Sequence, residues 1–190
     1  MDQSTESDPA EETEALSLRD GTRVLVRRVR PDDKSLLQSM MAGLSNRSRY
    51  QRFAMVVLEL PKEQLEYLTE VDNQNHVALV AIDRSAGQEV AVGVARYIRD
   101  DEDPEAAEVA VTVADSFQGR GLGTLLLVRL AETARSMGVK RFLAFACFDN
   151  LPVLKLVREV GAAIRFFGSG MVRITGAVPT TLDWTAESTY

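Results

Sequence analysis

Cysteine and histidine are almost absent from this sequence of 190 residues, which contains one of each. A single cysteine, Cys147, cannot form an intrachain disulfide, and one Cys with one His cannot build a zinc cluster. We therefore expect no metal ion. Cys147 lies in an apolar run, where a small core residue is the expected role rather than an acyl carrier. His76 precedes an expected strand, and we interpret it as structural or exposed rather than catalytic.

The sequence also lacks an excess of positive charge, since its formal net charge is −6. Six of the 28 acidic residues lie within the first sixteen positions, which hold no Lys or Arg, and their removal leaves 22 acidic against 22 basic groups. A neutral body cannot neutralise a phosphate backbone, so nucleic acid is excluded as the main partner. The N-terminal stretch is polar, acidic and free of aromatic residues, which predicts a disordered tail over residues 1–17.

Long apolar runs are missing as well. The longest is Phe142–Phe148, far below the roughly 18 apolar residues that a membrane span requires. The N-terminus is acidic and has no apolar core, unlike a secretory signal. We therefore expect a cytoplasmic protein with no membrane partner.

The sequence does contain a regular succession of strand and helix patterns, which predicts one α/β (α+β) domain over residues 18–176 and a C-terminal tail over residues 177–190. Helical segments are expected after Pro31, Ser45 and Pro61, residues that suit the first turn or the cap of a helix. Runs rich in β-branched and apolar residues predict about seven strands, at Val24–Val29, Val77–Ile82, Val90–Tyr97, Glu108–Val113, Arg141–Phe148, Ala163–Phe167 and Met171–Ile174.

A glycine-rich stretch, Gln118–Gly123, joins the expected strand Glu108–Val113 to a long helical pattern that ends near Gly138. Glycines at such a turn permit backbone angles that other residues avoid. Several N–H groups then converge beside the positive end of the helix. The sequence therefore predicts a turn that binds a pyrophosphate.

Spacing separates three glycine-rich devices that fit this description. A P-loop requires a Lys after its last glycine, and none follows here. A dinucleotide fingerprint requires a third glycine where Thr124 stands, and it normally opens its fold. The third pattern is Gln or Arg, two residues, Gly, one residue, then Gly or Ala, and Gln118–Gly123 fills every position. On this motif the sequence resembles the GNAT superfamily of acyl-CoA-dependent N-acyltransferases.

The resemblance extends over roughly residues 22–175. It implies the GNAT fold, a mixed, mostly antiparallel twisted sheet of about seven strands with helices on both faces and a splayed central parallel pair. The first half is most similar to the GNAT domain of bacterial protein lysine acetyltransferases. The segments that carry this similarity are Val26–Asp33, Leu44–Phe53 and Thr69–Asp72 before Ala78–Ala81.

The resemblance implies acetyl-CoA as cosubstrate and an amine as acceptor, with a protein lysine preferred. It also implies that Glu108 is the general base, on the same side of the pleat as Ala110 and Thr112; an ordinary exposed strand-end carboxylate is the alternative. The residues implied in coenzyme binding are Val111, Val113, Gln118, Gly119, Arg120, Gly121, Gly123, Thr124 and Asn150.

One position departs from the superfamily. The motif that begins at Asn150 often continues to a tyrosine that protonates the departing thiolate, and Val157 stands in that place. Valine cannot donate a proton, so water takes this part or activity is weak. Two alternatives stay open: a small-molecule amine acetyltransferase, because GNAT acceptor sites vary greatly, and a non-catalytic acyl-CoA-sensing module, which the departure at Val157 suggests. We expect a monomer or a homodimer.

Overall fold

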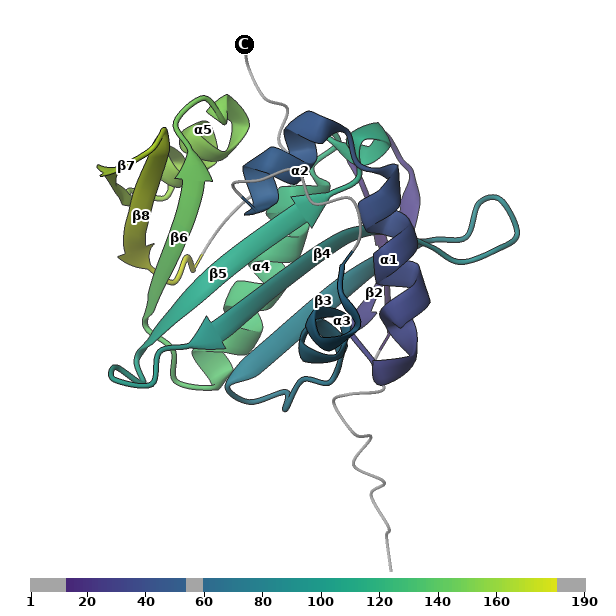
Figure 1. Ribbon diagram of the computed structural model, residues 1–190, viewed down its shortest axis with the longest axis horizontal. Helices are drawn as coiled ribbons and strands as arrows, with labels where there is room; N and C mark the ends of the chain where they lie inside the picture. Colours follow the sequence, from purple (N-terminus) through teal and green to yellow (C-terminus); the bar gives the residue numbers. More distant parts are fainter. Residues whose placement is uncertain (1–12, 54–59, 181–190) are drawn as a thin grey trace, which may run out of the picture.

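The computed structural model describes residues 13–53 and 60–180 (Figure 1). Within these residues, eight strands form one sheet in the order β1-β2-β3-β4-β5-β6-β8-β7. All neighbouring strands are antiparallel except β5 and β6, which are parallel. The strands are β1 (Glu14–Ser17), β2 (Arg23–Arg28), β3 (His76–Asp83), β4 (Val90–Arg99), β5 (Ala106–Val113), β6 (Arg141–Cys147), β7 (Ala163–Gly168) and β8 (Met171–Ala177).

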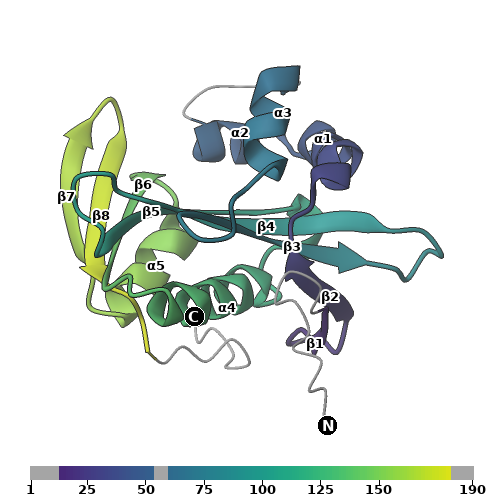
Figure 2. The same ribbon diagram turned by 90° about the horizontal axis from the view of Figure 1, so that it is seen from below.

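Helices cover both faces of this sheet, as Figure 2 shows. The helices on one face are α1 (Lys34–Gly43), α2 (Asn46–Phe53) and α3 (Lys62–Thr69), and those on the other are α4 (Leu122–Ser136) and α5 (Leu151–Glu159). Single turns of 3-10 helix, η1 (Pro31–Asp33) and η2 (Asp115–Phe117), precede α1 and α4. In the described ranges, no helix has the length and apolarity needed to cross a membrane. The predicted fold class is thus confirmed: a mostly antiparallel mixed sheet with one parallel pair and helices on both sides.

The sequence did not predict β1, and it extended the acidic tail to residue 17. In the structure Glu14–Ser17 pairs with β2, and the Glu14 carboxylate accepts two hydrogen bonds from Arg129 of α4, at 2.6 and 2.8 Å. A carboxylate that a charge count assigns to a solvated tail is therefore an ion-pair partner of the long helix. Residues 1–12 and 181–190 lie outside the described part of the chain.

The long helix α4 packs closely on β4 at Gly93. A side chain there would meet the core, because a Cβ built on Gly93 lies 2.9 Å from Leu126 Cδ1 and 3.1 Å from Leu122 Cδ2. Both leucines are fully buried, together with the other residues on that face of the helix: Leu125, Leu130, Ala131 and Ala134. The absence of a side chain at position 93 lets α4 lie against the centre of the sheet.

The parallel pair is short, and it opens into a fork. Strands β5 and β6 are in register only at Ala106–Arg141, Ala107–Phe142 and Glu108–Leu143. Beyond these positions β5 continues beside β4, and β6 continues beside β8. The side chains from Val109 to Val113 are accordingly only half-buried. The expected splay of the central parallel pair is therefore present.

A buried ion pair fixes the chain where β2 turns into α1. Arg27 of β2 and Asp33 of η1 form two hydrogen bonds of 2.7 Å, and both side chains are less than a tenth exposed. The Arg30 amide also donates to Asp33, at 2.8 Å. Burial alone would raise the pKa of Asp33, but the hydrogen bonds from Arg27 and Arg30 outweigh it and hold the pKa below its usual value.

We predict that Asp33→Asn destabilises the fold by about 3–5 kcal/mol at pH 7, because it leaves the Arg27 charge buried without its partner. Since the native pKa of Asp33 is lowered, its contribution is complete above pH ~4 and is lost as the pH falls through the native value. Urea unfolding at several pH values should show that the difference in unfolding free energy between wild type and Asp33→Asn becomes smaller below pH ~4. The control is Asp32→Asn, because Asp32 is exposed and lies next to Asp33. An equal loss of stability in Asp32→Asn would contradict the prediction.

Candidate active site

The glycine loop adopts the backbone shape that its residues predicted. Gly119 and Gly121 have φ angles of 75° and 88°, in the left-handed region that other residues rarely adopt. Gly121 is the N-cap of α4, and hydrogen bonding within the helix begins with the Leu125 amide on the Gly121 carbonyl. The amides of residues 122–124 precede that first bond and project from the positive end of the helix. This arrangement can hold an anion.

Gly123 lies where the start of α4 faces β5. A Cβ built on it would lie 3.6 Å from Val113 Cγ2 and 4.0 Å from Val111 Cγ1, which is ordinary contact. A methyl group therefore fits there, whereas a longer side chain would extend over the valines into the fork. The loop, Val111 and Val113 are thus brought together, as the sequence predicted.

A hydrogen-bond network ties this loop to α2. The Asp115 carboxylate accepts from the Ser45 amide at 2.7 Å, the Ser45 hydroxyl at 2.9 Å and the Ser48 hydroxyl at 2.6 Å. Gln118 Nε2 donates to the Val113 carbonyl and to Ser48 Oγ, each at 3.1 Å. Burial would raise the pKa of Asp115, but the bonds from the two serines lower it. The Gln118 side chain therefore holds the loop in place.

Sequence reasoning missed this network. Ser45 could be identified as a helix cap from its type and position, but its pairing with Asp115 joins residues far apart in the chain. An acidic residue directly after a strand that leads into a glycine loop was the available signal.

Arg120 joins the glycine loop to the turn between β1 and β2. Its guanidinium lies 3.2 Å from Asp20 and 4.9 Å from the centre of the Phe117 ring. Its carbonyl accepts from the Arg19 amide at 3.2 Å. Thr124 is half-buried in the first turn of α4. The loop is thus held from two sides, by α2 and by the turn between β1 and β2.

Glu108 lies at the apex of the fork, because its pair with Leu143 is the last between β5 and β6. Its side chain is exposed and lies on the same face of β5 as Ala110 and Thr112. This is the face that α1, α2 and α3 cover farther along the sheet (Figure 2). The structure therefore places Glu108 beside the opening rather than in the core.

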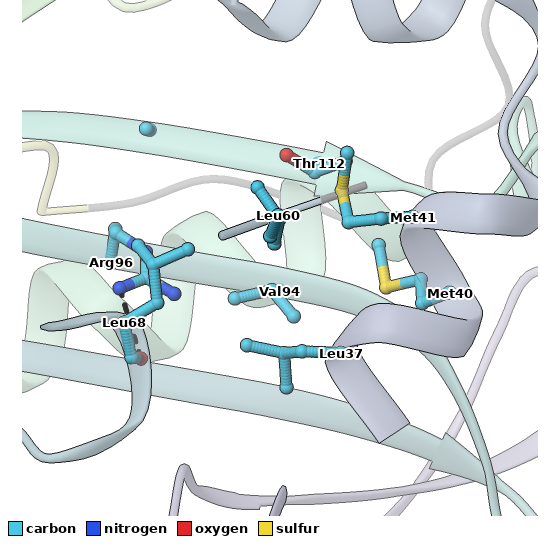
Figure 3. Close-up of a pocket in the computed structure, with 9 residues that line it drawn as sticks. Leu37, Met40, Met41, Leu60, Leu68, Val94, Arg96 and Thr112 are labelled. Carbon is cyan, nitrogen blue, oxygen red and sulfur yellow. Dashed lines mark hydrogen bonds between the residues drawn. The ribbon is translucent and has the colours of Figure 1, made fainter. Parts of the chain in front are cut away.

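A small hollow of about 30 Å³ lies against Ala110 and Thr112, farther along the face of β5 that carries Glu108 (Figure 3). Ala110 and Thr112 of β5 form one side of it. Arg96 of β4 donates to the Leu68 carbonyl at 3.2 Å. The other lining residues are apolar: Leu37, Met40, Met41, Leu60, Leu68 and Val94. Because the hollow is only about the size of one water molecule, apolar side chains fill most of this face.

His76 and Cys147 do not join this constellation. Burial and the Arg96 charge lower the pKa of His76 to about 4, with Asp72 opposing them, so the imidazole is neutral at pH 7. It packs beside Tyr67, with ring centres 5.0 Å apart. Burial raises the pKa of the Cys147 thiol, which is a poor nucleophile in that state. Within the described residues, no group of His, Cys, Asp and Glu is arranged to hold a metal ion.

Asn150 serves as the N-cap of α5, since its Oδ1 accepts from the Val153 amide at 3.4 Å. It lies at the end of β6, across the fork from the glycine loop. Val157 of the same helix packs on a buried cluster that includes Ala146, Val172 and Ile174. The position that departs from the superfamily is thus part of a hydrophobic core.

Comparison with known proteins agrees with this architecture. The chain is 34% identical over 147 residues to acetyltransferase Pat of Mycolicibacterium smegmatis, an alignment that covers 77% of this chain and 43% of Pat. It is 32% identical over 152 residues to acetyltransferase PA5475 of Pseudomonas aeruginosa, an alignment that covers 80% of this chain and 79% of PA5475. The chain therefore spans less than half of the Mycolicibacterium relative.

Solved structures of GNAT proteins also resemble this chain. The GNAT domain of S. lividans PAT matches with a TM-score of 0.80 and 30% identity, over 90% of this chain and 99% of that domain. A cAMP-binding acyltransferase from Mycobacterium smegmatis matches with a TM-score of 0.63 and 31% identity, over 88% of this chain and 48% of that protein. Residues 45–162 match the model of the Acetyltransferase (GNAT) family, and the chain belongs to this family.

Proposed function

We propose that this GNAT acetyltransferase transfers the acetyl group of acetyl-CoA to a protein lysine side chain, with Glu108 as the general base. The observation that carries the proposal is the fork between β5 and β6, which has Glu108 at its apex and the glycine loop at its open end. The relatives acetyltransferase Pat and S. lividans PAT support an acetyltransferase. The resemblance of Val26–Asp33 and Leu44–Phe53 to bacterial protein lysine acetyltransferases supports a protein acceptor.

The residues around the fork fit coenzyme A. Left-handed glycines, projecting amides and a helix N-terminus suit a pyrophosphate. The edge of β5 from Val111 to Val113, which β6 leaves after Glu108, offers backbone groups to the pantetheine arm. Gln118 would act by holding the loop, and Asn150 by fixing the start of α5 across the fork.

The proposed mechanism is direct attack. A lysine with a pKa near ~10.4 is almost fully charged at neutral pH, so Glu108 must first accept a proton from the ammonium group. The neutral nitrogen then forms a bond to the thioester carbonyl carbon, and a backbone N–H of β5 donates to the oxyanion. The carbon–sulfur bond breaks, the new amide nitrogen loses its second proton to water, and the coenzyme A thiolate takes a proton from water, since Val157 cannot supply one.

One observation favours a second candidate. Because Val157 replaces the usual proton donor, a non-catalytic acyl-CoA-sensing module would keep the same loop and fork without turnover. A panel of lysine-containing proteins, polyamines, aminoglycosides and amino acids with acetyl-CoA separates a protein acetyltransferase from a small-molecule acetyltransferase and from the sensing module.

We predict that Glu108→Gln lowers the acetylation rate by roughly 10²–10⁴-fold, the usual contribution of a positioned base. Coenzyme A affinity should be unchanged, because the coenzyme contacts lie on other residues, and higher pH should partly restore the rate by supplying neutral amine. Steady-state kinetics and calorimetry measure both. Glu102→Gln, on the exposed loop before β5, is the control. A wild-type rate in Glu108→Gln at pH 7 would end the assignment.

We predict that Gly123→Glu abolishes coenzyme A binding, because its side chain and negative charge enter the space for the pyrophosphate. Gly123→Ala should retain binding, since its methyl group meets Val113 at an ordinary 3.6 Å. Calorimetric titration with coenzyme A tests the pair, and thermal unfolding checks that both variants fold. Unchanged affinity in a folded Gly123→Glu protein contradicts the proposed site.

The pH–rate profile should show one essential ionisation, that of the base, with a plateau above it. A tyrosine acting as general acid would make the rate fall again near pH ~10. Val157 cannot ionise, so we expect no such fall. Measurement of kcat/KM between pH 5 and about 10.5 tests this. A clear bell-shaped profile would mean that another residue protonates the thiolate.

A further inference from the structure

One sheet face beside the fork carries exposed aromatic and basic side chains. It is the face of β6, β8 and β7 opposite α5, and we call it the outer face, defined by Leu143, Phe145, Arg165, Phe167 and Arg173. Among the described helices, α2 contacts this face at β6, and no helix covers this face of β7 and β8, as Figure 2 shows at that end of the sheet. The rings of Phe145 and Phe167 pack edge to face at 4.9 Å, yet they remain 37% and 63% exposed.

The outer face is continuous with the face that carries Glu108. Glu108 pairs with Leu143, and in-register neighbours in a sheet point to the same side. One step along β6, Phe145 pairs with Arg173 of β8, which in turn pairs with Arg165 of β7. A row of one phenylalanine and two arginines therefore lies one pleat farther along, on the same side of the sheet as Glu108.

The two arginines are costly where they lie, because like charges directly opposite each other on neighbouring strands repel. Both side chains are exposed, and neither forms an ion pair or hydrogen bond within the part of the chain that the structure describes. By contrast, Arg141 at the start of β6 is paired with Asp103 and Glu105. A carboxylate placed between Arg165 and Arg173 would relieve the repulsion and could accept paired hydrogen bonds from a guanidinium group.

Resting on the function proposed above, we propose that the outer face docks the acceptor protein through an acidic segment next to the target lysine. Aromatic and Arg side chains are the residues enriched at protein interfaces. The charge complement is an Asp or Glu side chain, and the rings of Phe145 and Phe167 supply the apolar contact. This adds substrate specificity to the site: a lysine that has acidic residues at a set distance.

Sheet geometry sets that distance. Arg173 is two strands across and one pleat along from Glu108, which is roughly 12 Å between Cα atoms, and Arg165 is roughly 16 Å away. An extended chain advances about 3.3 Å per residue, so the acidic residues fall about three to five positions from the lysine. The separation exceeds the Debye length of about 8 Å at physiological salt, so Glu108 itself does not repel them.

The test uses lysine peptides that carry Glu, Gln or Lys at positions three to five from the acceptor. Wild-type kcat/KM should be about tenfold higher for the Glu peptide than for the Gln peptide, the sum of two partly exposed charge pairs. The gain should lie in KM and shrink with added salt. The double variant Arg165→Glu/Arg173→Glu should lose the preference for Glu and acquire one for Lys, with the Gln peptide unchanged. Phe145→Ser/Phe167→Ser should raise KM for all three peptides without changing kcat.

The control is Arg158→Glu, which makes a single charge reversal on α5, on the opposite side of this part of the sheet. It should leave the peptide preference as in wild type. Coenzyme A affinity and thermal unfolding verify that each variant folds.

Several results would overturn the inference. Equal use of the three peptides by wild type removes the outer face as a docking site while the acetyltransferase assignment stands, whereas no turnover of any peptide refutes the proposed function itself. If the phenylalanine variants alter sedimentation but not KM, a second copy of the chain occupies the face. If deletion of residues 1–12 abolishes the effect of the arginine reversals, the acidic N-terminal segment is the occupant.

Discussion

The short register between β5 and β6 is the constraint on which the rest of the site depends. The chain returns from α4 with the amides of Lys140 and Arg141 on the Glu105 carbonyl, so β6 starts level with the start of β5. After Glu108 the two strands have different partners, β4 for one and β8 for the other. The opening therefore results from strand pairing and does not require a moving segment. Any ligand that enters it meets an unpaired strand edge on one side and the N-terminus of α4 at its end.

The fork would not bind an anion unless the glycine loop were held at its mouth. Two sets of contacts do this: Asp115 and Gln118 join the loop to α2, and Arg120 joins it to the β1–β2 turn through Asp20. Because α2 also contacts β5 and β6, the same helix borders the loop and the opening. The polar network thus couples the coenzyme side of the proposed site to the acceptor side, through Ser48 in particular.

The sequence predicted what depends on local pattern and left out what depends on distant pairing. The glycine loop, the buried stripe of α4 and the face of Glu108 follow from spacing alone, and the structure places them as expected. The strand β1 was missed because four residues with an acid among them carry almost no pattern of their own. The Asp115–Ser45 contact was missed because it spans 70 positions. The number of residues over which β5 and β6 pair cannot be predicted from the sequence of either strand, because it depends on where β6 begins to pair with β8 alone.

The fork and the departure at Val157 are connected. In the structure the Val157 side chain belongs to the core between α5 and the β6–β8 pair, so a proton donor there would need a different packing of Ala146 and Val172. The opening, however, is lined by half-buried β5 residues and by an exposed Glu108, which leaves its apex in contact with solvent. Water can therefore reach both ends of the proposed reaction, accepting the proton that leaves Glu108 and supplying the one that the thiolate needs. A coenzyme A thiol with an ordinary pKa near ~8.5 makes this last transfer undemanding at neutral pH. The activation of the amine is the step that requires a positioned side chain.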